Sequence, residues 1–302
     1  MTIGVTGASG FIGRNLVTHL TSRGDQVVPV RRPYDARGLG DVFHRVTAAV
    51  HLAGLVSAVR DEDFIAANVD ATRIVAEAAR DAGVRLIHIS SLAAAGPAPV
   101  SAPRSETDPP RPITAYGRSK LAGERVVQDT EGLRWIVLRP GVVYGPGDRA
   151  MLPLFRMAQR GALPLVGRAG AAYTMIHVAD VVRAIAAAVD AQLTGDTIFV
   201  GHPSPVTPRA IVDGIRAVVA PHASVVTVPM ALTRVAAWCG QAAQGVLRRP
   251  VLINDSRYRE LDAEGFVCRV DRLRERLGVV AEIGLVEGLR QTGEWYRREG
   301  WL

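Results

Sequence analysis

Short apolar segments alternate along the first half of the chain with segments whose apolar residues recur at helical spacing. The short segments, rich in branched residues, are residues 2–6, 27–30, 48–52, 86–89 and 134–138. The clearest helical stretch runs from about Phe64 to Ala82, where apolar residues repeat every three or four positions. Short buried strands that alternate with helices are typical of an α/β fold. We therefore expect a doubly wound parallel sheet with helices on both faces.

After about residue 150 the pattern is less regular. We expect helices near residues 151–160 and 178–191, a turn around residues 167–170 and a helical carboxy terminus. The proline-rich segment 97–112 is expected to be a loop, and its position makes it a candidate lid. An apolar stretch from Val225 to Ala237 is open to three interpretations, which are core packing, a substrate wall and a partner contact.

Three glycines, Gly7, Gly10 and Gly13, follow the first predicted strand and enter the first predicted helix. In that setting the spacing permits a tight turn, lets the backbone approach a pyrophosphate and lets the helix pack closely on the strand. It predicts a Rossmann-type dinucleotide-binding domain over residues 1–150, to which residues from about 173 to 200 return. Residues 151–302 would mainly form a substrate-binding lobe.

The end of the second predicted strand bears on the choice of dinucleotide. An acidic residue there would bind the ribose 2′-hydroxyl of NAD, whereas this chain has Arg31 and Arg32, which suit the 2′-phosphate of NADP. We therefore favour NADP as the cofactor. NAD stays possible, because arginine is abundant throughout the chain.

Lysine is almost absent from the sequence: of 36 Lys and Arg residues, only Lys120 is a lysine. It lies four residues after Tyr116, a spacing that places both side chains on one face of a helix. A nearby ammonium and a positive nicotinamide ring both favour a phenolate, which would lower the pKa of Tyr116 toward the range of a general acid or base. We interpret the pair as the centre of an acid–base site.

Seven short motifs surround these residues in order. They are T-G-A-S-G-F-I-G at 6–13, V-H-L-A-G at 50–54, N-V-D-A-T at 68–72, I-S-S at 89–91, Y-G-R-S-K at 116–120, R-P-G-V-V-Y-G-P-G-D at 139–148 and I-H-V-A-D at 176–180. Together they resemble the extended short-chain dehydrogenases/reductases of the NAD(P)-dependent epimerase/dehydratase-like group. The resemblance extends over nearly the whole chain.

The resemblance implies a role for each member of a catalytic tetrad. Tyr116 would exchange the proton, Lys120 would activate it and bind the nicotinamide ribose, and Asn68 would support the lysine through a water relay. Ser91, next to Ser90, would hold the substrate oxygen. The residues implied to bind the cofactor are Gly7, Ser9, Gly10, Phe11, Ile12, Gly13, Arg31, Arg32, Leu52, Ala53, Gly54, Ser90, Tyr116, Lys120, Pro140, Gly141 and Val143. Those expected to bind the substrate are Ser91, Leu92, Ala93, Tyr116, Tyr144 and Arg149.

The chain departs from this family's pattern in the interval after the second strand. Only 17 residues separate Val30 from Ala48, too few for the helix, strand and helix that the family normally places there. We expect one crossover helix, around Leu39 to Arg45, and a sheet that lacks the usual third, edge strand. The adenine would then be more exposed, or held by Arg31, Arg32 or Tyr34.

A second departure concerns the substrate. Family members that act on sugar nucleotides usually carry an arginine four residues before the position matched by His177, and this chain has Tyr173 there. The missing cation argues against a nucleotide diphosphate, although Arg149, Arg156 or Arg168 could replace it.

Composition limits the other classes of function. The net charge of +7 comes from scattered arginines, which indicates a basic surface rather than a nucleic-acid site. We expect no membrane span, no leader and no metal site, and hence a cytoplasmic protein without a membrane partner. The resemblance implies a homodimer paired through the helix that carries Tyr116 and Lys120.

We conclude from the sequence that the chain is an NADP-preferring oxidoreductase. It would transfer hydride between the nicotinamide and a secondary alcohol or ketone of a small, fairly apolar substrate. The first alternative is a sugar-nucleotide epimerase or dehydratase that retains its NAD. The second is a dinucleotide-binding sensor that kept the fold without the chemistry.

Overall fold

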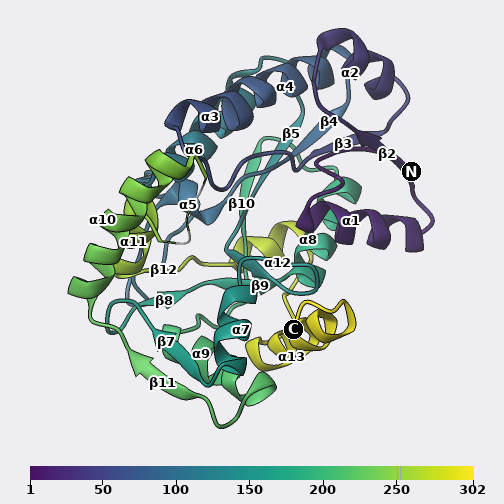
Figure 1. Cartoon of the computed structure of the whole chain (residues 1–302). Coiled ribbons are helices and arrows are strands. Elements are labelled where there is room, and N and C mark those ends of the chain that lie inside the picture. Colours follow the sequence, from purple (N-terminus) through teal and green to yellow (C-terminus); the bar gives the residue numbers. More distant parts are fainter. Residues whose placement is uncertain (250, 252) are drawn as a thin grey trace.

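A six-stranded parallel sheet forms the centre of the computed structural model, which describes residues 1–249, 251 and 253–302 (Figure 1). The strand order is β10-β5-β4-β3-β1-β2. The strands are β1 (Thr2–Thr6), β2 (Gln26–Val30), β3 (Ala48–His51), β4 (Arg85–Ile89), β5 (Trp135–Pro140) and β10 (Asp196–Val200). The predicted doubly wound α/β fold is confirmed, and the late strand β10 joins the sheet beside β5.

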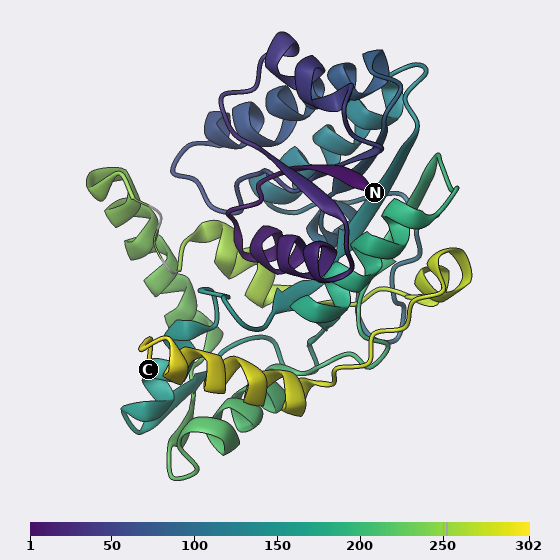
Figure 2. The same cartoon turned by 90° about the vertical axis from the view of Figure 1, so that its right-hand side faces the viewer.

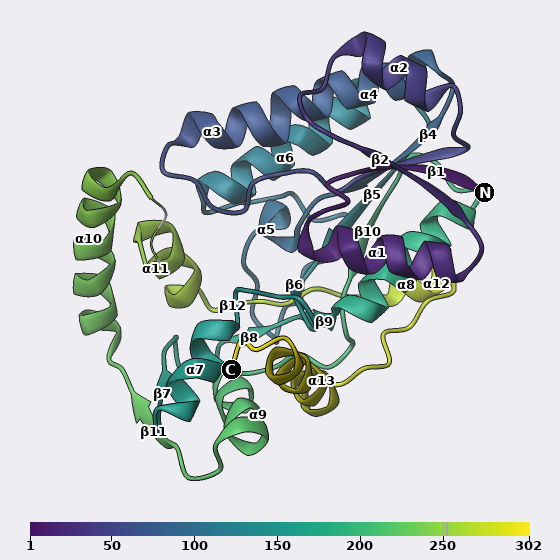
Figure 3. The ribbon, with the colours of Figure 1, turned by 45° about the vertical axis from the view of Figure 1, so that its right-hand side comes forward.

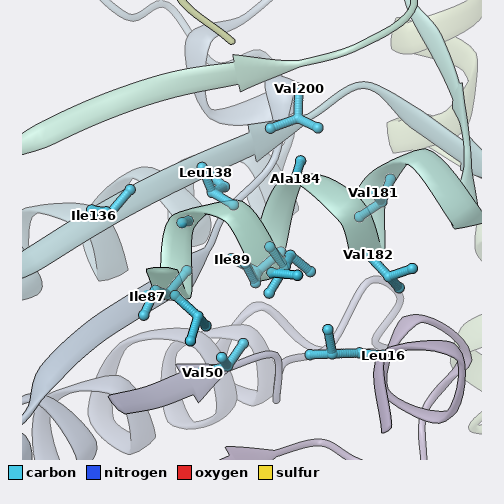
Figure 4. Packing of buried hydrophobic residues seen from close by; sticks show 14 of the residues in the cluster. Leu16, Val50, Ile87, Ile89, Ile136, Leu138, Val181, Val182, Ala184 and Val200 are labelled. Carbon is cyan, nitrogen blue, oxygen red and sulfur yellow. The ribbon is translucent and has the colours of Figure 1, made fainter. Parts of the chain in front are cut away.

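Helices cover both faces of this sheet (Figure 3). One face carries α1 (Phe11–Ser22), α8 (Val178–Asp190) and α12 (Asp271–Leu277), and the other carries α2 (Ala36–Phe43), α4 (Ala71–Asp81) and α6 (Ala115–Asp129). Figure 4 shows Leu16 of α1 and Val181 of α8 packed with Ile87 and Leu138 of the sheet. The apolar periodicity of the helices therefore serves two separate cores, one on each face.

The usual third strand is missing, as the sequence predicts. β2 is the edge of the sheet, and one helix, α2, makes the crossover to β3. This helix begins earlier than the predicted 39–45, because the side chain of Asp35 caps it by accepting a hydrogen bond of 2.8 Å from the Gly38 N–H.

The predicted helix over residues 64–82 is interrupted. It comprises α3 (Asp61–Ile65), a π-helical turn η1 (Ala66–Asp70) and α4. A π-helical turn holds one extra residue, which changes the direction of the side chains within it. Asn68 lies in this turn.

The rest of the chain builds a second lobe below the sheet in Figure 1. It contains α7 (Leu152–Gln159), α9 (Pro208–Val219), α13 (Leu285–Arg298) and the parallel pair β7 (Ala162–Leu165) and β11 (Ser224–Thr227). Two further pairs connect it to the sheet: β6 (Val142–Tyr144) with β9 (Met175–His177), and β8 (Ala172–Tyr173) with β12 (Gly265–Phe266). The domain boundary near residue 150 stays a prediction.

Two helices extend from this lobe beside the sheet. α10 (Met230–Leu247) lies on the outside, and α11 (Asp255–Asp262) lies between α10 and the rest of the molecule (Figure 3). None of the helices in the described part of the chain is both long and apolar enough to cross a bilayer.

The proline-rich segment 97–112 is a loop with one short helix before it, α5 (Leu92–Ala95). Backbone bridges join Ala98 to Phe266 and Arg104 to Cys268. The candidate lid is therefore attached at two points to the segment that follows α11, once at β12 and once just after it.

Candidate active site

The glycine loop connects β1 to α1 with the backbone geometry that its spacing predicts. Gly7 has a φ of +69°, and a Cβ there would meet the Ala53 backbone at 2.8 Å. A Cβ on Gly13 would lie 2.1 Å from the Gly7 carbonyl oxygen. Both positions need glycine, one for its conformation and one for close packing. Gly10 is the N-cap of α1 and brings no side chain to cap it.

These features fit a dinucleotide pyrophosphate. A helix N-terminus without a side-chain cap offers unpaired N–H groups and the positive end of the helix dipole. The carboxyl ends of β1, β3, β4 and β5 lie at one edge of the parallel sheet, where such folds bind their ligands. The predicted cofactor residues that follow these strands are Gly7, Ser9, Gly10, Leu52, Ala53, Gly54, Ser90, Gly141 and Val143, and Pro140 ends β5.

Arg31 and Arg32 lie just after β2 and are both exposed. The guanidinium of Arg32 lies 5.7 Å from the centre of the Tyr34 ring and lines an open cavity of about 430 Å³ together with Leu55, Ser57 and Asp63. Of the three residues that the sequence suggests for the adenosine end, Arg32 thus lines a cavity and lies beside Tyr34.

Helix α6 carries both Tyr116 and Lys120. Thr114 caps it by accepting a 3.1 Å hydrogen bond from the Gly117 N–H. A Cβ on Gly117 would lie 2.4 Å from the Ala93 carbonyl oxygen, so glycine lets the first turn of α6 approach α5. That approach brings Tyr116 next to Ser91, which is the N-cap of α5.

The phenol of Tyr116 is protonated in this environment. Burial raises the pKa of Tyr116 to about 12, and the Ser91 hydroxyl acts in the opposite direction by hydrogen bonding. The Phe64 ring lies 6.2 Å from the Tyr116 ring. Desolvation is the largest influence on this pKa in the structure, and the lowering that the sequence predicts from Lys120 together with a positive nicotinamide ring stays a prediction.

Lys120 is buried, and its ammonium donates a 2.7 Å hydrogen bond to the Ile89 carbonyl oxygen. Burial lowers the pKa of Lys120 to about 8, and the carboxylate of Glu124 opposes this shift. The side chain therefore stays mostly charged at neutral pH. It borders Gly54, because a Cβ on that glycine would lie 3.8 Å from the Lys120 Nζ.

Asn68 holds the loop that follows β3. Its side chain accepts a 2.8 Å hydrogen bond from the Leu55 N–H and donates one of 2.9 Å to the Leu55 carbonyl oxygen. It also donates a 2.9 Å hydrogen bond to the Ser119 hydroxyl on α6. Asn68 is thus a bridge between this loop and α6, while its relay to Lys120 stays a prediction.

A buried ion pair was missed by the sequence reasoning. Glu124 lies one turn after Lys120 and makes two hydrogen bonds, of 2.9 and 2.6 Å, with the Arg139 guanidinium. The Ser90 hydroxyl also donates to Glu124. The sequence contained a signal for Glu124, because it follows Lys120 by four residues, as Lys120 follows Tyr116. It contained no such signal for the partner, Arg139. The two neighbouring serines therefore have different partners. The Ser90 hydroxyl donates to Glu124, whereas Ser91 lies beside Tyr116.

Two predicted substrate residues are corrected by the structure. Tyr144 is only 1% exposed, its hydroxyl donates a 3.3 Å hydrogen bond to the Gly284 carbonyl oxygen, and it packs in the core of the second lobe. Leu92 is 3% exposed and packs with Phe199 and Phe266. Both are core residues because the strand or helix that carries them turns that side chain inward.

The other two substrate candidates stay predictions. Ala93 is half-buried beside α6. Arg149 is exposed, and its guanidinium lies 5.0 Å from the centre of the Trp301 ring near the end of the chain.

The substrate side of the site includes residues that were not predicted. Burial raises the pKa of both Tyr116 and Tyr173, and the carboxylate of Glu260, on α11, adds a smaller shift in the same direction. Tyr173, on β8, has a buried hydroxyl with no hydrogen-bond partner among the described residues. Glu260 thus influences both tyrosines from α11, which follows the first domain in sequence.

Comparison with known proteins agrees with this geometry. Residues 3–201 match the NAD dependent epimerase/dehydratase family. Over 99% of its length the chain is 30% identical to a ceramide reductase from Caulobacter vibrioides, covering 96% of that protein. Over 90% of its length it is 29% identical to the 4-hydroxy-2-methyl-3-oxo-4-farnesyl-3,4-dihydroquinoline-1-oxide ketoreductase of Stigmatella aurantiaca, covering 95% of it.

A solved structure of MoeE5 with UDP-glucuronic acid and NAD superposes with a TM-score of 0.80 at 28% identity, covering 99% of this chain and all of that one. The family match includes the glycine loop, Ser91, Tyr116 and Lys120. The chain therefore belongs to the NAD dependent epimerase/dehydratase family and is an NAD(P)-dependent oxidoreductase.

Proposed function

We propose that this enzyme uses NADPH to reduce the ketone of an apolar substrate. The observation that carries the proposal is the close approach of α5 and α6, which brings Tyr116 and Lys120 to the Ser91 end of α5. A ketone reduction consumes a proton at the carbonyl oxygen, and a half-buried phenol whose pKa is raised is a suitable donor for it. Two relatives that match over nearly the whole chain have names that describe reductases of apolar compounds.

The residues of the site would have separate roles in cofactor binding and in proton transfer. The glycine loop and the α1 N-terminus hold the pyrophosphate, and Lys120 binds the ribose hydroxyls. When bound, the dinucleotide supplies hydride from its nicotinamide ring. Ser91 would donate a hydrogen bond to the carbonyl oxygen of the substrate. Hydride addition turns that oxygen into an alkoxide, and Tyr116 would protonate it, because an alkoxide is a stronger base than a phenolate.

The substrate side supports an apolar molecule without a diphosphate. Tyr173 occupies the position where sugar-nucleotide enzymes usually have an arginine, and its hydroxyl is neutral. Phe64 adds an aromatic wall beside Tyr116. The nearby Arg257 is paired with Glu260 at 3.1 Å, so its charge is already balanced.

Steady-state assays test both parts of this proposal. NADPH and NADH oxidation would be measured with apolar ketones of increasing chain length, with polar hydroxyketones and with nucleotide sugars. We expect kcat/KM to rise with chain length and to be higher with NADPH. Turnover confined to nucleotide sugars would refute the proposal.

The NADP preference has its own variant. Replacing Arg31 and Arg32 by alanine should reduce the NADPH preference by about tenfold, because two cations that suit a 2′-phosphate are removed. Arg37→Ala, an exposed arginine on the neighbouring α2, is the matched control and should leave the preference unchanged. An equal NADPH preference in both variants would show that Arg31 and Arg32 do not select the cofactor.

A sugar-nucleotide epimerase is the second candidate, because MoeE5 was solved with UDP-glucuronic acid and NAD at 28% identity. Such an enzyme retains its NAD through the reaction. Purified protein that carries bound NAD and interconverts UDP-sugars without added cofactor would establish it.

The cellular setting is also part of the proposal. Cys239 is an exposed free thiol and Cys268 a buried one, which fits a reducing compartment such as the cytoplasm. A homodimer paired through α6 is expected from the family resemblance, and analytical ultracentrifugation would test it.

A further inference from the structure

Helix α10 has its apolar side on the outside. The side that faces the protein is centred on Thr233, Ala237 and Gln244, which are buried. The opposite side of the helix carries Leu232, Val235, Trp238 and Val246, together with Ala231, Cys239 and Ala242. Trp238 is 75% and Val246 84% exposed. A surface helix of a soluble protein normally shows the reverse arrangement.

Polar contacts, rather than this apolar side, attach the helix to the protein. The Gln244 amide reaches the carbonyl oxygens of Ala58 and Val59 at 3.4 and 3.5 Å, and its oxygen accepts a 3.2 Å hydrogen bond from the Asn254 side chain. A Cβ on Gly240 would lie 2.0 Å from the Ile253 carbonyl oxygen. The inner side is therefore fixed in place, and the orientation of α10 is set by close contact.

The outer side faces away from the molecule. Figure 2 shows the helix, coloured green, extending from the body of the protein, and Figure 3 shows α11 on its inner side only. Within residues 1–249, 251 and 253–302, the side chains of Leu232, Val235 and Trp238 stay at least half exposed. Exposed apolar side chains that adjoin one another usually mark a contact surface.

Along the sequence, the charges on α10 and immediately next to it all have one sign. From Gly214 to Asn254 the sequence contains four arginines and no aspartate or glutamate. Arg234, on α10, and Arg248 and Arg249, which follow it, are exposed. An apolar helix side flanked by arginines, with a tryptophan on it, has the composition of helices that lie in the interface of an anionic bilayer.

We propose that the outer side of α10, defined by Leu232, Val235, Trp238 and Val246, lies on the surface of an anionic lipid bilayer. The helix would lie parallel to the membrane plane, with its apolar side among the acyl chains and the arginines at the phosphates. A second copy of the chain is a poorer occupant, because symmetric pairing would bring these unbalanced arginines together. Such a contact would differ from the sequence-based expectation of no membrane partner, which stays a prediction.

Vesicle flotation tests the proposal with the full-length protein and without substrate or dinucleotide, so the result does not depend on the proposed reaction. The probes are vesicles of phosphatidylcholine alone and vesicles that also contain phosphatidylglycerol in about equal amount. We expect binding to the anionic vesicles, weakened by salt, and a blue shift of tryptophan fluorescence that is absent in Trp238→Phe.

Two sets of variants separate the apolar contribution from the charged one. Leu232→Ser combined with Val235→Ser and Trp238→Ser should weaken vesicle binding at least about tenfold, because the inserted surface is lost. Arg248→Ser with Arg249→Ser should weaken binding to the anionic vesicles by roughly tenfold and reduce the salt dependence, because Arg234 remains. Val286→Ser, an exposed valine on α13, is the matched control and should bind like the parent.

Three results would overturn the proposal. They are no flotation of the parent protein with either vesicle, equal flotation of the triple serine variant, and sedimentation that shows α10-dependent self-association without vesicle binding. The last result would assign the surface to a second copy. Circular dichroism melts of each variant verify that the fold is retained.

Discussion

Surface helices usually have apolar residues inside and polar residues outside. Helices α6 and α10 depart from this arrangement in opposite ways. On α6 the buried side contains Ser119, Lys120 and Glu124, and each has a partner for its polar atoms. On α10 the apolar residues are outside, and polar Gln244 is inside. Burial thus does not follow hydrophobicity on either helix. On α6 the cost of burying charge is offset by pairing, whereas α10 leaves apolar surface in contact with water.

The difference separates two kinds of function. A charged group is buried where its protonation or its position is used, as at Lys120 beside Tyr116. An apolar group is exposed where something outside the chain is to be bound. Substitutions on α6 should therefore change chemistry or folding, and substitutions on the outer side of α10 should change neither.

The largest effect is expected for Tyr116→Phe. Removing the phenolic proton donor should lower kcat by about 10³-fold, in the middle of the range for a general acid. NADPH affinity, measured by fluorescence titration, should change little. Tyr144→Phe is the control, because the Tyr144 hydroxyl is bonded to a backbone carbonyl in the core. If Tyr144→Phe lost as much activity, the correction of Tyr144 to a core residue would be wrong.

Glu124→Gln should cause the next largest effect, on stability. The change leaves the Arg139 guanidinium buried without its carboxylate, which costs about 3 kcal/mol or more. Urea unfolding measures the loss. Adding Arg139→Met should recover part of it, because the uncompensated charge is then removed. A neutral effect of Glu124→Gln would mean that the ion pair is not needed to fix α6.

A smaller effect should appear in the pH dependence of kcat/KM. Lys120 has a pKa of about 8 in the folded protein, so activity that needs the ammonium should fall about tenfold per unit above pH 8. The unfolded chain keeps this proton up to about pH 10.5, so the free energy of unfolding should rise with pH between the two values. Glu124→Gln should move the activity limit to lower pH, because the carboxylate raises the pKa of Lys120. Lys120→Met should lack the limit, and a fully active Lys120→Arg enzyme would contradict the role of the ammonium.

The smallest effect is expected on α10. Leu232→Ser should change the free energy of unfolding by less than about 0.5 kcal/mol, because the side chain is already exposed. Leu20→Ala, in the fully buried core under α1, should cost about 2–5 kcal/mol in the same urea titration. A large loss from Leu232→Ser would show that the outer side of α10 is packed against the protein.

Local patterns predicted most of the sheet and its missing strand. Apolar segments located the strands, and the short interval before Ala48 showed that only one helix could fit. The glycine spacing also predicted the turn between β1 and α1, and the Tyr116–Lys120 spacing predicted that both residues lie on one helix. Both predictions depend only on neighbours within a few residues.

The failures depend on contacts that are distant in sequence. The direction of the Tyr144 and Leu92 side chains is set by packing against residues near Gly284 and Phe199. Burial raises the pKa of Tyr116, and the carboxylate of Glu260 on α11, distant in sequence, adds to this shift. The exposed side of α10 could be read from its sequence as apolar, but only the structure shows on which side its contacts lie.

Because the third strand is missing, β2 is a free edge of the sheet. The unpaired backbone groups of such an edge can pair with a strand of another chain. This edge contains Pro29, and Arg31 and Arg32 follow it directly. Proline removes one backbone donor from a ladder, and charged neighbours disfavour stacking of like strands. The same arginines that we assign to the cofactor phosphate would thus also protect the shortened sheet from edge-to-edge aggregation.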